Sequence, residues 1–182
     1  MQVAVNLSIR QFEQKDIAEQ IKNTLLEAGL QPKHLELEIT ESMVMNDING
    51  AILTLNHLRK LGIHISVNDF GTGYSSLSYL KQLPIQCLKI DKSFIDDLCH
   101  DTDAAAIVSA IISMAGNLDL TVVAEGVETK EQMGFLRKEG CNHMQGYFYS
   151  MPLPTEKFTA LLHKKTHARN VIPFKLNDSV LS

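Results

Sequence analysis

Short apolar runs alternate with amphipathic segments along most of the chain. The apolar runs are rich in Val, Ile and Leu and end at polar residues, a pattern that predicts buried strands. They lie at residues 3–8, 35–42, 63–69, 87–91, 121–128 and 144–147. The segments between them carry apolar residues three or four positions apart and predict helices. These lie at residues 16–28, 47–61, 75–82, 101–117, 129–140 and 155–163. Alternation of this kind predicts an α/β fold with a parallel sheet.

The most informative stretch spans residues 63–74, where a β-branched run stops at Asn68 and Asp69 and a glycine-rich turn follows. One interpretation is a buried parallel strand whose C-terminal end presents two oxygen-bearing side chains to a cleft. The other is an ordinary strand-to-loop turn, because Asn, Asp and Gly are common loop residues. Taken alone, the stretch leaves both interpretations open.

Polar side chains also mark the ends of the other predicted strands. They are Asn6, Glu38, Lys89, Glu125 and Gln145. An α/β barrel places such residues together at its catalytic mouth, and oxygen ligands there suit a hard cation such as Mg²⁺ or Mn²⁺. Lys89 lies within an apolar strand, so it needs an anionic partner. Glu41 and Glu128 could equally be helix caps or solvated loop charges.

Composition limits the classes of function. The chain has 182 residues, of which 45% are hydrophobic and 21% charged, which suits one packed domain. A net charge of −4 argues against binding to long nucleic acid but permits a small anion held through metal ions. Three cysteines without CxxC spacing indicate a reducing, cytoplasmic location, and no stretch is long and apolar enough for a membrane span. The helical pattern weakens after residue 163, which predicts a domain over residues 1–163 and a tail over residues 164–182.

Six motifs occur in a fixed order and resemble those of the EAL-domain family. They read NLS, ELEITES, NDFGTGYSSLSYL, LKIDKSFI, VVAEGVET and QGYFYSMPLP, and the resemblance covers residues 3–162. The family comprises bacterial cyclic-di-GMP phosphodiesterases, which form linear pGpG, and catalytically degenerate relatives. The resemblance implies a TIM-like (β/α) barrel of which about six of eight strands are present. The strand bearing Glu-Ala-Leu has no counterpart, so we expect either a longer protein or a second chain that covers the open edges.

The resemblance assigns roles to individual positions. Matches to the family's ligands for Mg²⁺ or Mn²⁺ are Asn6, Glu38, Asn68, Asp69 and Glu125. Lys89 matches a lysine that orients or deprotonates the attacking water, Glu128 a glutamate that holds the loop after the Asn68-Asp69 strand, and Gln145 a ligand-binding residue. The loop and dimer segment of the family corresponds here to Phe70, Gly71, Thr72, Gly73, Tyr79 and Leu80. A homodimer through this face or the next helix is therefore expected.

Two departures from the family bear on activity. The opening glutamate is missing with its strand, and Asn68 stands where the family has the aspartate that bridges two metal ions. An amide offers one acceptor oxygen and no charge, so it cannot bridge two cations as a carboxylate does. We therefore expect a catalytically impaired domain that acts as a cyclic-di-GMP sensor or a docking module. Two alternatives stay open: an active phosphodiesterase once the missing strands are supplied, and a protein-interaction module that binds no nucleotide.

Overall fold

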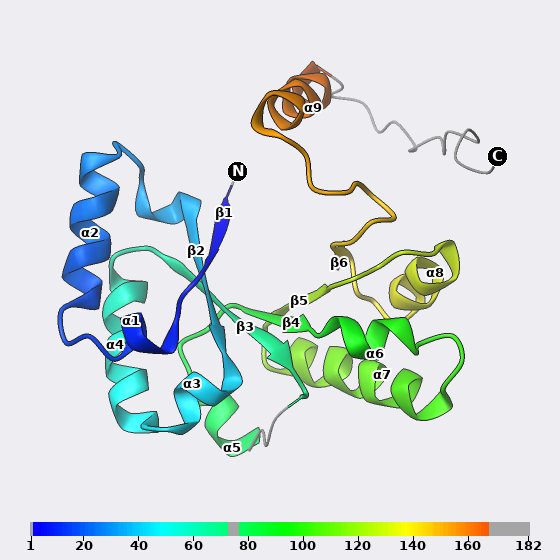
Figure 1. The fold of residues 1–182 in the computed structure, drawn as a ribbon. Helices are drawn as coiled ribbons and strands as arrows, with labels where there is room; N and C mark the ends of the chain where they lie inside the picture. The colour runs from blue at the N-terminus through cyan, green and yellow to red at the C-terminus, as the bar shows by residue number, and fades with distance from the viewer. Residues whose placement is uncertain (1, 73–76, 168–182) are drawn as a thin grey trace. The chain divides into compact units, whose positions relative to one another are not determined.

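Six parallel strands form one sheet in the order β1-β2-β3-β4-β5-β6. The computed structural model describes residues 2–72 and 77–167. Within this part of the chain the strands curve into a half-barrel (Figure 1). They are β1 (Val3–Asn6), β2 (Leu35–Thr40), β3 (His64–Phe70), β4 (Cys87–Ile90), β5 (Thr121–Ala124) and β6 (His143–Met144). The predicted α/β class and the incomplete barrel of about six strands are confirmed.

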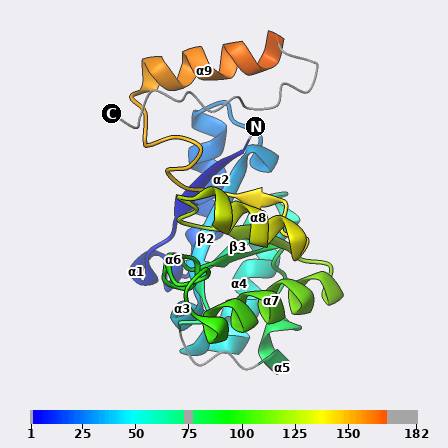
Figure 2. The ribbon, with the colours of Figure 1, turned by 90° about the vertical axis from the view of Figure 1, so that its right-hand side faces the viewer.

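Helical segments lie between successive strands along the chain, so each strand is connected to the next through one or more helices (Figures 1 and 2). The structure divides into two units, of which the first covers residues 1–149. The longer helices of this unit are α2 (Ile17–Glu27), α4 (Ile48–Lys60), α7 (Thr102–Asn117) and α8 (Lys130–Lys138). Shorter ones are α1 (Ile9–Phe12), the 3-10 helix η1 (Pro32–His34), α3 (Glu41–Met45), α5 (Leu77–Leu80) and α6 (Lys92–Asp96). Helix α4 packs against β3, and α7 packs against β4 and β5.

The strands alternate between an apolar face and a polar face. Side chains on the apolar face are buried under the helices: Leu37, Ile39, Ile65, Val67, Leu88 and Ile90. They join Leu55, Leu58 and Val108 of the helices in one core. The other face carries Glu38, Ser66 and Lys89, which are also buried although they are polar. Such groups are costly to bury unless they are paired, so this face is where a site is expected.

The sheet is open at both of its outer strands. Strands β1 and β6 each pair with a single neighbour among the described residues. Val3 and Val5 of β1 remain 50% and 46% exposed, although apolar side chains on an inner strand would be covered. The expectation that a six-stranded sheet exposes two edges and some apolar surface is confirmed.

Several local details differ from the sequence-based prediction. Helices α1 and α3 were not predicted, because four or five residues are too few to show a helical period. Strand β5 ends at Ala124, so Glu125 lies just beyond it. Helix α8 begins with a capping box, in which the side chains of Thr129 and Gln132 each accept a hydrogen bond from the other's backbone N–H. Of the three free cysteines, Cys87 and Cys141 are buried and Cys99 is exposed.

Residues 150–182 form a second unit. Its described part contains α9 (Thr155–His167), whose backbone continues four residues past the predicted end at residue 163. Met151, Leu153 and Phe158 of this unit are exposed. None of the helices described in either unit combines the length and apolar character that a membrane crossing requires.

Candidate functional site

The polar residues singled out in the sequence lie where the strands end, at the side of the sheet formed by their C-terminal ends, which we call the carboxyl edge. Parallel strands end on the same side, so Asn6, Glu38, Asn68, Asp69, Lys89 and Glu125 are brought to the carboxyl ends of successive strands. Asn6 and Glu38 are paired in register between β1 and β2. Gln145 directly follows β6, where its backbone N–H donates to the carbonyl of Ala124. The carboxyl edge therefore gathers the predicted residues of all six strands.

Lys89 occupies the centre of this group. Its Nζ lies 2.6 Å from Oε1 of Glu38 and 2.5 Å from Oε1 of Glu125, and its side chain is only 6% exposed. The anionic partner expected for a buried lysine is thus present twice. Burial alone lowers the pKa of the Lys89 ammonium, but the hydrogen bonds to Glu125 and Glu38 outweigh it and raise the pKa above its usual value. Lys89 is therefore a fixed cation at neutral pH.

Strand β3 changes its path where Asn68 and Asp69 occur. The pairing with β4 shifts between Val67 and Phe70, and Asp69 has a φ of +54°, which non-glycine residues adopt rarely. Oδ1 of Asn68 is buried and has no hydrogen-bond partner among the described residues. An unpaired buried acceptor is costly, so this oxygen is a candidate ligand atom.

Asp69 and Asp91 form a pair of neighbouring carboxyl groups. Burial raises the pKa of Asp69, and the negative charge and hydrogen bond of Asp91 raise it further. The pKa of Asp91 is lowered, chiefly because the hydroxyl of Ser93 donates a hydrogen bond to its carboxylate. The pair therefore divides into a carboxyl group that holds its proton more readily and one that stays ionised.

Glu128 lies away from the cluster around Lys89. Its Oε1 is 2.6 Å from Nζ of Lys92, and its side chain is 40% exposed. The predicted role in holding the loop after β3 stays a prediction, because residues 73–76 lie outside the described residues.

The predicted loop and dimer residues occupy different environments. Phe70 and Leu80 are buried, whereas Tyr79 is 38% exposed. Gly71 has a φ of +98°, and a Cβ there would lie 3.0 Å from the ring of Phe94. The hydroxyl of Thr72 donates to the carbonyl of Asp69. Gly73 lies outside the described residues, so only the beginning of this loop is defined.

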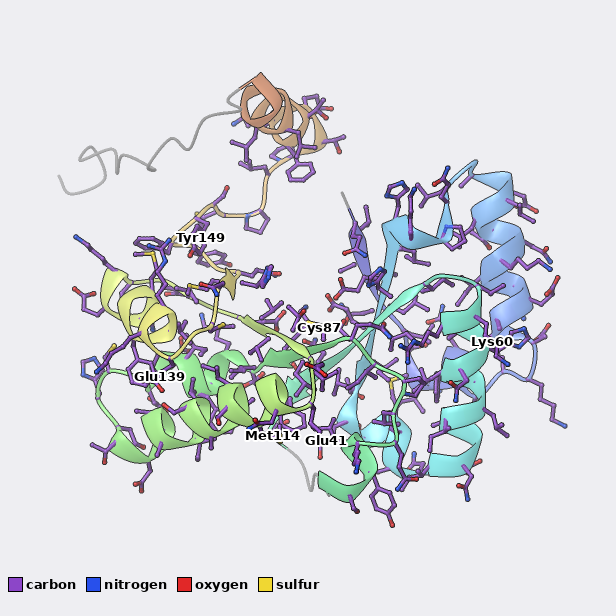
Figure 3. The ribbon with its side chains drawn as sticks, turned by 180° about the vertical axis from the view of Figure 1, so that it is seen from behind. Glu41, Lys60, Cys87, Met114, Glu139 and Tyr149 are labelled. Carbon is purple, nitrogen blue, oxygen red and sulfur yellow. The ribbon has the colours of Figure 1, made fainter. Side chains whose placement is uncertain are left out.

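Glu41 is a buried carboxylate, whereas the sequence suggested a helix cap or a solvated loop charge. It is 8% exposed, and neither oxygen has a hydrogen-bond partner among the described residues. It begins α3 (Figure 3) and lines a small apolar pocket with Val44, Val67, Phe70 and Leu80. The sequence signal was its place three residues after Glu38, which helix capping explained equally well.

The donor set suits a hard cation. Glu38, Asp69 and Glu125 supply carboxylates, and Asn6 and Asn68 supply amide oxygens, which are the ligand types of Mg²⁺ and Mn²⁺. No group of three or more His, Cys, Asp or Glu within residues 2–72 and 77–167 is close enough to hold an ion as they stand. Lys89 takes the place between Glu38 and Glu125.

Replacing Lys89 by methionine should destabilise the protein strongly. Lys89→Met leaves Glu38 and Glu125 without their shared cation, and breaking a buried ion pair removes about 3 kcal/mol or more from the free energy of unfolding. Urea unfolding measures the change. Lys22→Met is the matched control, because its pair with Glu19 is exposed and contributes about 0.5 kcal/mol or less. Equal losses in both variants would contradict this account.

Replacing Asp91 by asparagine should lower the pKa of Asp69. Asp91→Asn removes the negative charge that helps to raise it, while the contribution from burial stays. NMR titration of the Asp69 carboxyl carbon in the metal-free chain measures the shift toward its usual range. Asp97→Asn, an exposed change at the end of α6, should leave the titration unaltered. The same titration curve in Asp91→Asn and in the unaltered chain would contradict the coupling.

Comparison with known proteins places this geometry in a family. Residues 1–152 match the EAL domain. MucR of Pseudomonas aeruginosa, named a bifunctional diguanylate cyclase/cyclic di-GMP phosphodiesterase, is 49% identical over 158 residues, which are 87% of this chain and 23% of MucR. The signaling protein YkoW of Bacillus subtilis is 51% identical over 158 residues, 87% of this chain and 20% of YkoW. The chain thus spans about a fifth of these relatives.

Solved structures agree with the sequence match. The PaMucR phosphodiesterase in complex with c-di-GMP has a TM-score of 0.83 at 49% identity, and the match covers 86% of this chain and 64% of that one. Klebsiella pneumoniae BlrP1, solved as a manganese/cy-diGMP complex, has a TM-score of 0.77 at 34% identity over 83% of this chain and 39% of that one. The six-stranded half-barrel with polar residues at its carboxyl edge therefore belongs to the EAL domain family.

Proposed function

We propose that this chain is a cyclic-di-GMP-binding signalling domain of the EAL type whose hydrolytic activity is impaired by Asn68. The observation that carries the proposal is the Oδ1 of Asn68, which is buried beside Asp69 and has no hydrogen-bond partner within the described part of the chain. This position bears a neutral amide close to the carboxylates of Glu38, Asp69 and Glu125. The same position is the one at which the family resemblance implies a bridging aspartate.

Cyclic-di-GMP as the ligand is supported by the relatives. The PaMucR and BlrP1 structures are complexes with this nucleotide, and the similarity extends over more than four fifths of the present chain. The carboxyl edge of the sheet, where the polar residues gather, is also where barrels of this type bind ligands. A dianionic nucleotide suits a site that combines the Lys89 ammonium with a bound cation.

The residues fit one divalent cation. Glu38, Asp69 and Glu125 would hold it together with Asn6 and the side-chain oxygen of Asn68. The ion pairs that Lys89 makes with Glu38 and Glu125 would have to lengthen to free these carboxylates for the cation. When bound, such an ion lowers the pKa of a coordinated water and stabilises charge on a phosphoryl oxygen.

Hydrolysis requires water to add to phosphorus while the 3′ oxygen leaves with a proton, which gives linear pGpG. In the chain without metal, the hydrogen bonds to Glu125 and Glu38 raise the pKa of Lys89, so its ammonium can orient a water or contact a phosphoryl oxygen. The proton of the attacking water then needs a basic group such as Glu125, which lies beside Lys89.

Charge balance explains the proposed impairment. The three carboxylates and the single ammonium of the cluster together balance one divalent cation but not two. A carboxylate at position 68 would add one negative charge and a second ligand oxygen, whereas Asn68 adds neither. Two like-charged ions at a separation of about 3.5–4 Å need such a bridge.

An active phosphodiesterase is the second candidate. The 49% identity to MucR and the intact cluster of Glu38, Lys89 and Glu125 favour it. Activity would then depend on segments outside this sequence or on a single ion.

An assay of cyclic-di-GMP hydrolysis tests the proposal. The chain is incubated with the nucleotide and Mn²⁺ or Mg²⁺, and the products are separated by chromatography. We expect pGpG formation by the unaltered chain to be close to the level of Lys89→Ala, and Asn68→Asp to exceed that level roughly 100-fold, because a carboxylate that can bridge two cations is restored. Asn56→Asp, which adds a carboxylate to the exposed face of α4, should resemble the unaltered chain.

The assay also separates the candidates. Clear pGpG formation by the unaltered chain would show that Asn68 supports catalysis and that the domain is an active phosphodiesterase. A titration with cyclic-di-GMP then tests binding, and absence of binding by both the unaltered chain and Asn68→Asp would contradict a nucleotide-binding domain.

We further propose that the chain forms a homodimer through the face that carries Tyr79. Tyr79 is 38% exposed, so Tyr79→Glu should weaken association roughly tenfold or more without unfolding the chain. Sedimentation at several concentrations measures the change, with Leu53→Glu on exposed α4 surface as the control. Leu80 is buried in the single chain, so a charge there would test folding rather than association. Unchanged sedimentation of Tyr79→Glu would contradict the proposed face.

A further inference from the structure

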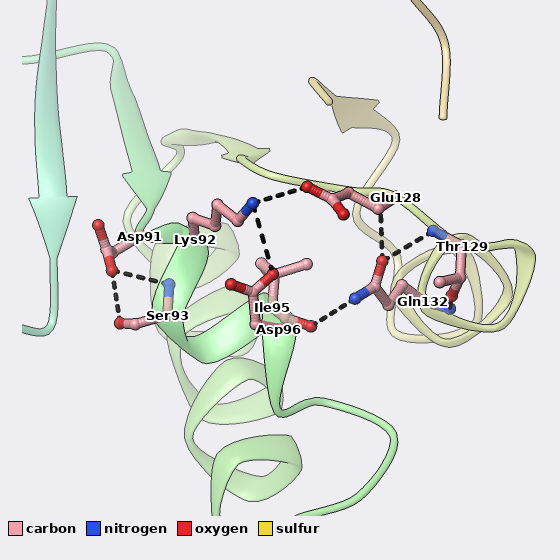
Figure 4. A network of polar contacts seen from close by, with 8 residues as sticks. All are labelled: Asp91, Lys92, Ser93, Ile95, Asp96, Glu128, Thr129 and Gln132. Atoms are coloured by element: carbon pink, nitrogen blue, oxygen red, sulfur yellow. Dashed lines mark hydrogen bonds and ion pairs between the residues drawn. The ribbon is translucent and has the colours of Figure 1, made fainter. Parts of the chain in front are cut away.

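Two segments of the carboxyl edge are joined by a pair of ion pairs with matching spacing. Strand β4 and the start of α6 supply Lys89 and Lys92, and the segment after β5 supplies Glu125 and Glu128. Nζ of Lys89 lies 2.5 Å from Glu125, and Nζ of Lys92 lies 2.6 Å from Glu128. The first pair is in the site, whereas the side chains of Lys92 and Glu128 lie outside the cluster around Lys89 and are 50% and 40% exposed. Figure 4 shows the outer pair.

The stem of Lys92 also lies against the backbone next to Glu125. Gly126 has a φ of +74°, and a Cβ at this position would lie 2.4 Å from Cγ and 2.8 Å from Cδ of Lys92. A glycine is required here both by the backbone angle and by the close approach of the lysine stem. Lys92 therefore contacts the chain at Gly126 and at Glu128, on the side of Glu125 that β5 does not hold.

Gln132 ties the same segment to α6 from its other end. Its Nε2 donates to the carbonyl of Ile95 at 2.9 Å, and its Oε1 accepts from the backbone N–H of Glu128 at 2.8 Å and of Thr129 at 2.9 Å (Figure 4). Gln132 is only 6% exposed, so these bonds are shielded from water. The start of α8 is thereby fixed relative to α6, and Lys92 fixes the residues in between.

We propose that Lys92 is a positioning residue that holds the segment 125–128 so that Glu125 stays beside Lys89. The backbone N–H of Glu125 donates to the carbonyl of Ile90 and that of Val127 to the carbonyl of Gln145, which fixes the main chain on both sides of Gly126. The contacts of Lys92 with Gly126 and Glu128 add side-chain restraints on the same turn. A carboxylate already held in place needs less ordering when a cation or nucleotide binds.

The inference extends the proposed function, because Glu125 is a proposed ligand there, and it has a test that does not need metal. In the free chain the ¹⁵N NMR signal of the Lys89 ammonium reports its hydrogen bond to Glu125, since burial slows exchange of its protons with water. Lys92→Met keeps most of the stem and removes the charge. We expect the signal to broaden or disappear in Lys92→Met and to return in Lys92→Arg, which restores a cation at this place.

Binding of Mn²⁺ alone, measured by calorimetry, supplies the second readout. Loss of a residue that supports a ligand typically weakens metal binding by about tenfold or more, so Lys92→Met should bind Mn²⁺ about tenfold more weakly and Lys92→Arg normally. Exchange of the two charges in Lys92→Glu with Glu128→Lys should recover part of the loss. Lys130→Met is the matched control, because Lys130 is exposed, lies two residues after Glu128 and belongs to α8.

The outcomes separate this inference from the proposed function. An unchanged Lys89 signal in Lys92→Met overturns the inference. An altered signal with unchanged Mn²⁺ affinity also overturns it, because Lys92 would then support the loop without affecting the site. If the unaltered chain binds no Mn²⁺, the proposed metal site fails, whereas the Lys89 signal still decides whether Lys92 positions Glu125.

Discussion

The burial of one ammonium group between two carboxylates from different strands is the constraint on which the site depends. Lys89 is almost inaccessible to water, and a charge in that position is tolerated only because Glu38 and Glu125 lie within hydrogen-bond distance on either side. The three residues come from β2, from β4 and from the turn after β5, so their pairing fixes how these strands end relative to one another. Charge pairing therefore determines how the side chains are arranged at the carboxyl edge. Apolar packing determines it on the face of the same strands that the helices cover.

The helix and loop geometry around this edge follows from the same requirement. Glu125 lies beyond the last residue of β5, although its backbone N–H still donates to Ile90 of β4. In the proposed arrangement, Lys92 of α6 and Gln132 of α8 add side-chain contacts to the segment that follows it. Interactions that contribute little to overall stability, such as the exposed pair of Lys92 and Glu128, can thereby matter for the geometry of a buried one.

The sequence predicts the repeating part of this structure and misses the irregular part. Alternating apolar runs locate the strands, although β6 covers His143–Met144 and shares only Met144 with the predicted run over residues 144–147. Lys89 in such a run correctly indicates a carboxylate partner. The positive φ of Asp69, the short helices α1 and α3, and the burial of Glu41 carry no periodic signal. The pairing of Lys92 with Glu128 joins residues 36 positions apart, and a single sequence gives no means of matching them among many exposed charges. The roles of the individual site residues likewise rest on the family resemblance rather than on pattern.

The choice of an amide or a carboxylate at position 68 affects both the stability of the fold and the capacity of the site to bind metal ions. A carboxylate at this position would add a further negative charge near Glu38, Asp69 and Asp91, with Lys89 as the cation already shared. Without bound metal, that repulsion would destabilise the fold and raise the pKa values of its neighbours. The amide avoids the repulsion, but it leaves a buried oxygen unpaired and removes the charge that a second cation needs. In the proposed function, Asn68 therefore favours a stable metal-free domain over one that holds two metal ions, which is the balance expected when function and stability compete at a charged site.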